Sequence, residues 1–271
     1  MTHPRPIGIF SWFGFPMPLE ERLHHIARAG FDATALWLGR EEPHVRSGNL
    51  DGIPAMARRC ELAIDNVHAP FSHCNDLWAA DRGAREAWLD EMTRCVDFCE
   101  RHAIPVVVIH VCQGASPPPI NAGGLETLTN LVQRAEDAGV VLAVENTARP
   151  DYINAALQAV ESPCLGMCYD SSHDFLAADN PGRLLQQWGH RLVATHFSDN
   201  GGVMDNHWLP GDGRIDWQRV AQVFPRDTYE GTILLETVVR DDSYPSADAF
   251  LAEAHARATS LRDRLAAPAA T

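Results

Sequence analysis

Lysine is absent from this chain, because all 22 basic residues among its 271 residues are arginine. The absence excludes chemistry that needs an ε-amine, namely Schiff-base catalysis, lysine-anchored pyridoxal phosphate and the P-loop lysine. Positive charge is also in short supply, since the formal net charge is -14. Neutralising nucleic-acid phosphates needs a basic surface. We therefore expect a small-molecule substrate rather than a nucleic-acid partner.

Long apolar runs and an export signal are missing as well. No apolar run approaches the roughly 18 residues that a membrane span needs, and residues 1–6 lack the charged and then apolar pattern of a signal peptide. The seven cysteines form no CxxC pair, which favours reduced thiols that serve in packing. We expect no membrane partner and a cytoplasmic location, and the sequence leaves open whether the chain forms a homo-oligomer.

Short runs rich in Val, Ile and Leu alternate with longer amphipathic stretches along the whole chain, which is typical of βα units. The expected strands are residues 7–12, 33–38, 63–68, 106–111, 140–145, 165–170, 192–197 and 232–237. Helical patterns lie between them, such as residues 18–29, 82–102, 124–138, 183–188, 217–223 and 246–265.

Eight such units predict one α/β domain, a single (β/α)8 TIM barrel over residues 1–265 with a frayed tail at 266–271, because this fold typically takes roughly 250 residues. The near-continuous apolar strands fit a parallel sheet that helices cover on the outside. No GxGxxG motif follows the first strand, which argues against an open dinucleotide-binding sheet.

Polar residues gather at the expected carboxyl ends of the strands, where such a barrel places its active site. They are His68, His110, Glu145, Asp170, His173, His196, Asp205, His207 and Glu236. Four carboxylates at one barrel mouth would repel each other strongly without a cation between them. Mixed imidazole and carboxylate ligands suit zinc or manganese better than calcium. The sequence therefore predicts a divalent-metal site.

Seven segments carry a resemblance to a known family. They are VHAPF at 67–71, VIHV at 108–111, AVENT at 143–147, CYDSSHD at 168–174, THFSDN at 195–200, DNHWLPGDGRIDW at 205–217 and LLET at 234–237. In this order the set resembles the xylose isomerase-like TIM-barrel superfamily. That superfamily joins metal-dependent sugar isomerases and epimerases to the endonuclease IV family of abasic-site nucleases.

The resemblance implies a core metal site formed by Glu145, Asp170, His196 and Glu236. In the isomerases and epimerases these residues hold one divalent ion, and the two glutamates also move protons. The implied reaction is isomerisation or epimerisation of a keto-sugar or sugar phosphate through a metal-bound enediolate, with Glu145 and Glu236 as the acid/base pair. For a sugar ring, Trp12, Phe71 and Trp208 could supply apolar walls, or could simply pack at the rim.

The other five residues point to an alternative. His68, His110, His173, Asp205 and His207 resemble the ligands with which the endonuclease IV family completes a three-metal cluster, so the chain would hold one to three ions. The alternative function is an abasic-site DNA nuclease or another phosphodiesterase. The loop after the second strand mixes Arg40 and Arg46 with acidic residues, which does not favour DNA. Asp212 stands where glutamate is usual in related sequences, and its role stays open.

Overall fold

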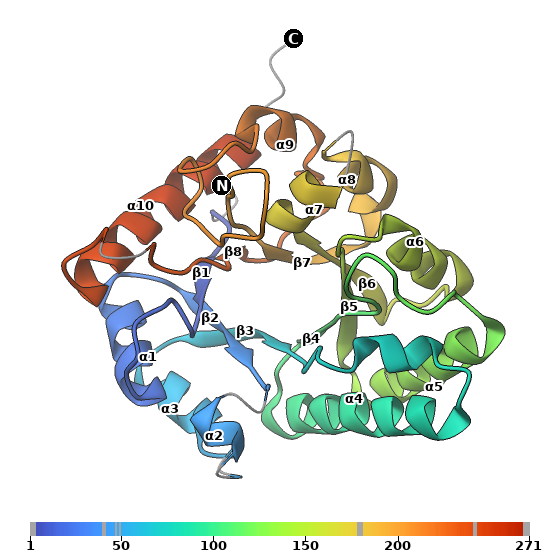
Figure 1. The fold of residues 1–271 in the computed structure, drawn as a ribbon. Helices are drawn as coiled ribbons and strands as arrows, with labels where there is room; N and C mark the ends of the chain where they lie inside the picture. Colours follow the sequence, from blue (N-terminus) through green and yellow to red (C-terminus); the bar gives the residue numbers. More distant parts are fainter. Residues whose placement is uncertain are drawn as a thin grey trace.

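Eight parallel strands form one sheet that curls into a barrel (Figure 1). The structure is a computed structural model, and it describes residues 4–39, 42–46, 48, 50–177, 181–240 and 243–267. The strand order is β7-β6-β5-β4-β3-β2-β1-β8. The bounds are β1 (Ile7–Phe10), β2 (Ala33–Trp37), β3 (Ala63–His68), β4 (Val106–Ile109), β5 (Val141–Glu145), β6 (Leu165–Asp170), β7 (Leu192–His196) and β8 (Ile233–Leu235). A parallel bridge between Phe197 and Leu235 brings the two ends of the sheet together. The predicted single (β/α)8 barrel is confirmed.

Helices surround the barrel on its outer face (Figure 1). They are α1 (Leu19–Arg28), α2 (Pro43–Arg46), α3 (Ile53–Arg59), α4 (Arg82–His102), α5 (Ala122–Ala138), α6 (Pro150–Ala159), α7 (Ser171–Ala177), α8 (Arg183–Trp188), α9 (Trp217–Val223) and α10 (Ala247–Ala266). The sequence pattern did not single out α2, α3, α6 and α7. Ala266, where the predicted tail begins, still belongs to α10, and residues 268–271 lie outside the described part of the chain.

Alternate residues of each strand face opposite sides of the sheet, and this divides the buried side chains into two sets. The outward-facing set packs against the helices and includes Val107 and Ile109 on β4 and Leu142 and Val144 on β5. A smaller set lies inside the barrel and includes Val106, Val108, Ala143, Cys168 and Ala194, together with a second group formed by Phe10, Ala35 and Leu234. These apolar residues fill the middle of the barrel, and its mouth is left for the larger polar side chains.

Several strands are shorter at their carboxyl ends than the sequence predicts. The last residues of the expected ranges 7–12, 106–111 and 232–237 leave the ladder, since the chain turns there into the loops that carry the polar side chains. Gly139, which precedes β5, has φ +65°, a left-handed conformation that glycine adopts without strain. No helix in the described part of the chain is both long and apolar enough to span a membrane. All seven cysteines are free thiols.

Candidate metal centre

The strand alternation that fills the barrel also directs the polar residues into its mouth. Two positions beyond Val108, Ala143, Cys168 and Ala194, on the same face of their strands, come His110, Glu145, Asp170 and His196. Glu236 stands in the same relation to Leu234, which is buried inside the barrel with Phe10. The polar residues converge because each is the last in the series of alternate residues on its strand that face the inside of the barrel.

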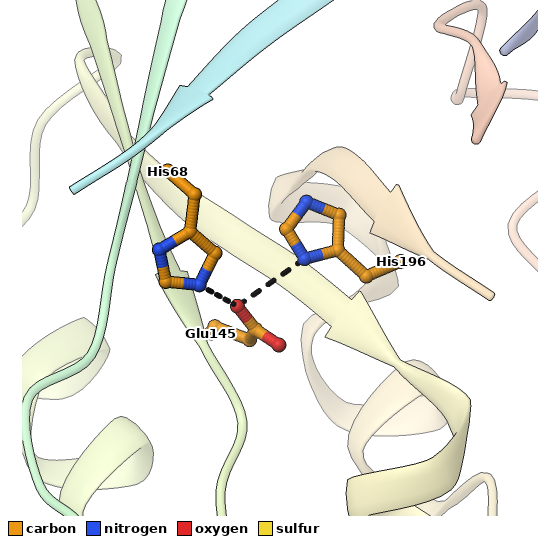
Figure 2. Close-up of side chains that lie close together, drawn as sticks. All are labelled: His68, Glu145 and His196. Carbon is orange, nitrogen blue, oxygen red and sulfur yellow. Dashed lines mark hydrogen bonds and ion pairs between the residues drawn. The ribbon is translucent and has the colours of Figure 1, made fainter. Parts of the chain in front are cut away.

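Glu145 lies at the centre of the group. Its Oε2 atom is 3.1 Å from His68 Nε2 and 3.2 Å from His110 Nε2. The same oxygen is 3.3 Å from His196 Nδ1, and Figure 2 shows the imidazoles of His68 and His196 directed at it from two sides. Glu145 is buried, with a side-chain exposure of only 1%. One carboxylate oxygen thus faces three imidazoles.

Two further carboxylates complete what we call the inner cluster, which consists of Glu145, Asp170, His196 and Glu236. His196 Nδ1 lies 3.0 Å from Glu236 Oε2. Asp170 Oδ1 accepts a hydrogen bond of 2.6 Å from the backbone N–H of His173. Asp170 and His196 are fully buried, so the inner cluster lies at the bottom of the barrel mouth.

What we call the outer cluster consists of His173, Asp205 and His207. Asp205 Oδ2 lies 3.1 Å from His173 Nε2 and 2.9 Å from His207 Nε2. His173 connects the two clusters, because its Nδ1 is 3.3 Å from Glu145 Oε1. His207 has φ +51°, and such a left-handed conformation in a non-glycine residue is often found where a functional group must be aimed.

Three histidines are oriented by backbone carbonyl groups. His68 Nδ1 donates to the Ala69 carbonyl at 2.8 Å, His173 Nδ1 to that of Asn146 at 2.9 Å, and His207 Nδ1 to that of Glu236 at 3.1 Å. A carbonyl only accepts, so each Nδ1 carries a proton. In the neutral ring the lone pair then lies on Nε2, which faces a carboxylate oxygen in all three cases. Such a carbonyl partner on the second nitrogen is usual for metal-binding histidine.

The inner cluster holds strongly perturbed groups. Burial opposes the charged form of Glu145, but the neighbouring His196 and His110 outweigh it and hold the pKa of Glu145 well below its usual range. Burial likewise opposes the charged form of His196, yet its contacts with Cys168, Glu145 and Glu236 raise the pKa of its imidazole well above the usual value. Without a metal, protonated imidazole supplies the positive charge that the carboxylates need.

Asp170 and the outer cluster are perturbed too. Burial, together with the charges of Asp205, Glu145 and Glu236, raises the pKa of Asp170 to about 7. Burial opposes the charged form of His207, but its hydrogen bond to Asp205 and the nearby Glu236 raise the pKa of the imidazole to about 10. Perturbed groups that gather in one cleft are typical of a functional site.

A cavity of about 380 Å³ opens over these side chains. Seven of the nine predicted residues line it, namely His68, His110, Glu145, His173, Asp205, His207 and Glu236. Its other walls include Phe71, Gln113, Thr147, Ala148 and Leu176. Phe71 stacks on His110 with ring centroids 4.9 Å apart and also contacts Trp37 at 4.9 Å. The cavity thus has a polar floor and a partly apolar side.

The other two aromatic residues proposed from the sequence have different surroundings. Trp12 is 42% exposed and lies against the guanidinium of Arg22, 5.3 Å from the ring centroid. Trp208 packs beneath the guanidinium of Arg240 at 4.4 Å. Neither tryptophan is among the described residues that line the cavity. Of the three aromatic residues proposed as substrate contacts, Phe71 is therefore the one that lines the cavity in the described part of the chain.

The loop that carries Asp205 and His207 is folded around a buried carboxylate, Asp199. Its Oδ1 accepts from the N–H groups of Asn200 and Ile215, at 2.9 and 3.1 Å. Its Oδ2 accepts from Gly211 N and Trp217 Nε1, at 2.8 and 2.9 Å. Asp212, by contrast, pairs at 3.3 Å with Arg257 on α10, and both side chains are about one-third exposed (35% and 33%). Asp212 therefore contacts the helix layer.

Sequence reasoning missed Asn146, which joins the ends of β5 and β6. Its side chain donates to the Asp170 carbonyl and accepts from the Asp170 N–H, both at 2.8 Å. Its own carbonyl accepts from His173. Its position directly after Glu145 was the available signal, since a side-chain amide just beyond a strand can pair with the next strand.

The inner cluster fits a divalent ion. Several of its atoms are buried without a hydrogen-bond partner among the described residues, namely Glu145 Oε1, Asp170 Oδ2, both ring nitrogens of His196 and Glu236 Oε2. Buried polar atoms are otherwise almost always paired. Two atoms bound to one zinc ion at about 2.0–2.2 Å and a tetrahedral angle are roughly 3.3–3.6 Å apart. Within the inner cluster, His196 Nδ1 lies 3.3 Å from Glu145 Oε2 and 3.0 Å from Glu236 Oε2. Ligand atoms of two trios, His68, Glu145 and His196, and Glu145, Asp170 and His173, each lie within 4.8 Å of one another.

Known proteins share the sequence pattern and the fold. The chain is 38% identical over 107 residues to the uncharacterized protein y4fM of Sinorhizobium fredii, a match that spans 39% of this chain and only 33% of that protein. It is 23% identical over 246 residues to the fructoselysine 3-epimerase of Shigella flexneri, covering 85% of this chain and 89% of the enzyme.

Solved structures and a family model agree with these relatives. A D-tagatose 3-epimerase-like protein superposes with a TM-score of 0.74 at 23% identity, over 97% of this chain and all of that one. The family model described as xylose isomerase-like TIM barrel matches residues 23–260. The match covers nearly the whole barrel, so this chain belongs to the xylose isomerase-like TIM-barrel family.

Proposed function

We propose that the protein is a divalent-metal-dependent isomerase or epimerase of a keto-sugar, with Glu145 and Glu236 as its proton-transfer residues. One observation carries the proposal. The two carboxylates, from the ends of β5 and β8, flank the same nitrogen, His196 Nδ1, at 3.3 and 3.0 Å, and both line the cavity. Two carboxylates beside one reaction site are what removal and return of a proton require.

The inner cluster would hold the ion through Glu145, Asp170, His196 and Glu236. A divalent ion, zinc or manganese, would supply there a Lewis acid that polarises the substrate carbonyl and makes the adjacent C–H more acidic. His68 and His110 contact Glu145 Oε2 and would orient this carboxylate. The unpaired buried atoms of the cluster support the assignment, because a cation would satisfy them together.

Glu145 and Glu236 differ in their surroundings, and this suits two different roles. Glu145 is buried, whereas the side chain of Glu236 is 21% exposed. Nearby His196 holds the pKa of Glu236 below its usual value despite burial. Both carboxylates are thus held in the ionised form that a general base needs. One would remove the proton next to the carbonyl, and the other would first take up a proton from solvent and then donate it to that carbon on the return step.

The relatives favour sugar chemistry. A fructoselysine 3-epimerase aligns with 85% of the chain, and the D-tagatose 3-epimerase-like protein shares the whole barrel. The partly apolar wall formed by Phe71, Ala148 and Leu176 could hold the less polar face of a sugar. We therefore infer a small-molecule sugar as the substrate.

A phosphodiesterase is the second candidate, because the outer cluster adds further ligands beside the inner one. His173 lies 3.3 Å from Glu145 and 3.1 Å from Asp205, so ions at both clusters would lie close together. Clustered metals can activate a hydroxide and stabilise the leaving oxygen of a phosphate ester. The net charge of -14 weighs against DNA as its substrate.

Solvent exchange tests the proposal. Protein loaded with manganese or zinc is incubated in deuterated water with D-tagatose, D-fructose, L-ribulose or fructoselysine, and products are analysed by NMR. Deuterium should appear at the carbon next to the carbonyl. Glu145→Gln and Glu236→Gln should each lower the exchange rate by roughly 100-fold or more, the usual scale for a lost acid or base.

Two controls make the outcome interpretable. Metal content is measured in each variant, because both glutamates are also proposed ligands. Glu86→Gln, at an exposed position on α4, should leave exchange unchanged. Turnover of a sugar without carbon-bound deuterium would contradict the proton-transfer roles. Cleavage of a phosphodiester with no sugar turned over would favour the second candidate.

A further inference from the structure

The two carboxylate oxygens of Asp205 have different partners. Oδ2 faces the imidazoles of His173 and His207, at 3.1 and 2.9 Å. Oδ1 accepts a hydrogen bond of 2.7 Å from the hydroxyl of Ser172. One oxygen is therefore left for the outer cluster, and the other is engaged by a neighbouring side chain.

Asn200 sets the direction of the bond from Ser172. Asn200 Oδ1 accepts from the backbone N–H of Gly202 at 2.7 Å, which fixes the orientation of the amide. Its Nδ2 then lies 2.6 Å from Ser172 Oγ, and an amide nitrogen can only donate. Because the hydroxyl oxygen accepts from Asn200, its single proton is directed to Asp205. Both Ser172 and Asn200 are fully buried, so water does not compete for these bonds.

We propose that Ser172 and Asn200 are positioning residues that hold Asp205 Oδ2 toward His173 and His207 and thereby set the affinity of the outer cluster for a divalent metal ion. The inference rests on the second candidate function, which places an ion at the outer cluster as well as at the inner one. Asp205 needs support because its side chain is 26% exposed and follows the exposed residues Val203 and Met204. Without the hydroxyl its carboxylate could turn to water, and ordering it again would weaken binding.

Zinc titration of metal-free protein tests the proposal without any measurement of activity. A chromophoric chelator competes for the ion, and the number and affinity of the protein sites are read from its absorbance. Asp205→Ala identifies the site that belongs to the outer cluster. Ser172→Ala should weaken that site by about 10- to 100-fold, the usual effect of losing a partner that orients a metal ligand. Its effect on the inner site should be small.

Asn200→Asp provides the sharper test. A carboxylate at this position cannot donate, so the Ser172 hydroxyl would turn its proton toward it and away from Asp205. The variant should therefore weaken the outer site as Ser172→Ala does, although the hydroxyl is still present. Ser172→Thr keeps the hydroxyl and should retain most of the affinity.

Ser198→Ala is the matched control, because Ser198 is equally buried and its Oγ has no hydrogen-bond partner among the described residues. It should leave both sites unchanged. Thermal unfolding of each metal-free variant checks that it is folded, and if Ser172→Ala does not fold, Asn200→Asp decides the question.

Unchanged outer-site affinity in the folded Ser172 and Asn200 variants would overturn the proposal. So would a wild-type protein in which Asp205→Ala alters no zinc site, since the outer cluster would then hold no zinc. In that case the proposed function stands or falls separately, on the inner site and on the deuterium exchange of the glutamate variants.

Discussion

His196 Nδ1 lies 3.0 Å from Glu236 Oε2 in an ion-pair contact, and neither atom has the geometry of a hydrogen bond to any described residue. A nitrogen and an oxygen this close, both buried, would normally share a proton. The orientation of the His196 imidazole and the Glu236 carboxylate instead suits two ligands that are both directed at a cation beside them. A cation bound by both would account for the arrangement.

Metal binding should therefore stabilise the protein. At a free zinc or manganese concentration about 100-fold above the dissociation constant, binding contributes about 2.7 kcal/mol. For a chain of this size that corresponds to a rise in Tm of roughly 5–10 °C. Thermal unfolding of chelator-treated protein, with and without each ion, measures the shift. Calcium is the control, because it prefers oxygen ligands, and equal shifts with calcium or none with zinc and manganese would contradict the prediction.

The buried carboxylate of Asp170 should destabilise the metal-free protein at neutral pH. Its pKa is raised to about 7 in the folded state from an ordinary 3.8, so the folded state binds a proton that the unfolded state has already released. The resulting loss of stability grows as pH rises from about 4 to 7 and is constant above that. Asp170→Asn removes it.

Metal-free Asp170→Asn should thus have a higher Tm than metal-free wild type at pH 8, with the gap narrowing toward pH 4. With zinc present the order should reverse, because the variant loses a proposed ligand. Tm values at several pH values check the higher Tm of the metal-free variant, and the same measurements with zinc check the reversed order. A gap that does not depend on pH would show that titration of Asp170 is not its cause.

Abasic-site DNA should be a poor substrate. The net charge of -14 disfavours close approach of a polyanion. A labelled duplex with one abasic site, incubated with metal-loaded protein, gives the answer on a denaturing gel. Rapid incision at catalytic protein concentration that disappears in Glu145→Ala would reverse the ranking of the two proposed functions.

Asp199 and Asp212 should contribute very differently to stability. Asp199→Ala leaves four N–H groups without their buried acceptor, and should cost about 3 kcal/mol or more. Asp212→Ala removes a contact to Arg257 that is partly exposed to solvent, and should cost about 0–1 kcal/mol. Urea unfolding measures both. Equal losses would mean that the loop does not depend on its buried carboxylate.

Much of this site could be predicted from the sequence, because two simple rules decide where its residues lie. Strand alternation places Glu145, Asp170 and His196 on the inner face, and the barrel brings the carboxyl ends of all strands to one mouth. Neither rule needs a contact between particular side chains. The nine predicted residues therefore converge, although five of the predicted strands extend one or two residues beyond the observed carboxyl ends.

The features of the site that could not be predicted from the sequence depend on contacts between distant segments. Trp12 follows a strand as the site residues do, but it lies against Arg22 on α1, and no periodicity encodes that pairing. The bond from Ser172 to Asp205 joins residues 33 positions apart through the path of a loop. Helix α7 also escaped notice, although the equally short α8 and α9 were expected, because it begins at Ser171 with no break after β6.

The closure of the barrel has a consequence for how the protein is synthesised. β8 pairs with β1, and Glu236 directly follows β8. During synthesis, β1 therefore gains this neighbouring strand only after β8 has been made. A nascent chain that ends before residue 233 already carries the histidines and carboxylates of β3 to β7 but lacks both the closing strand and Glu236. Until the final part of the chain emerges, the acidic and imidazole side chains of β3 to β7 lack both the strand that closes the barrel and the carboxylate that completes the inner cluster.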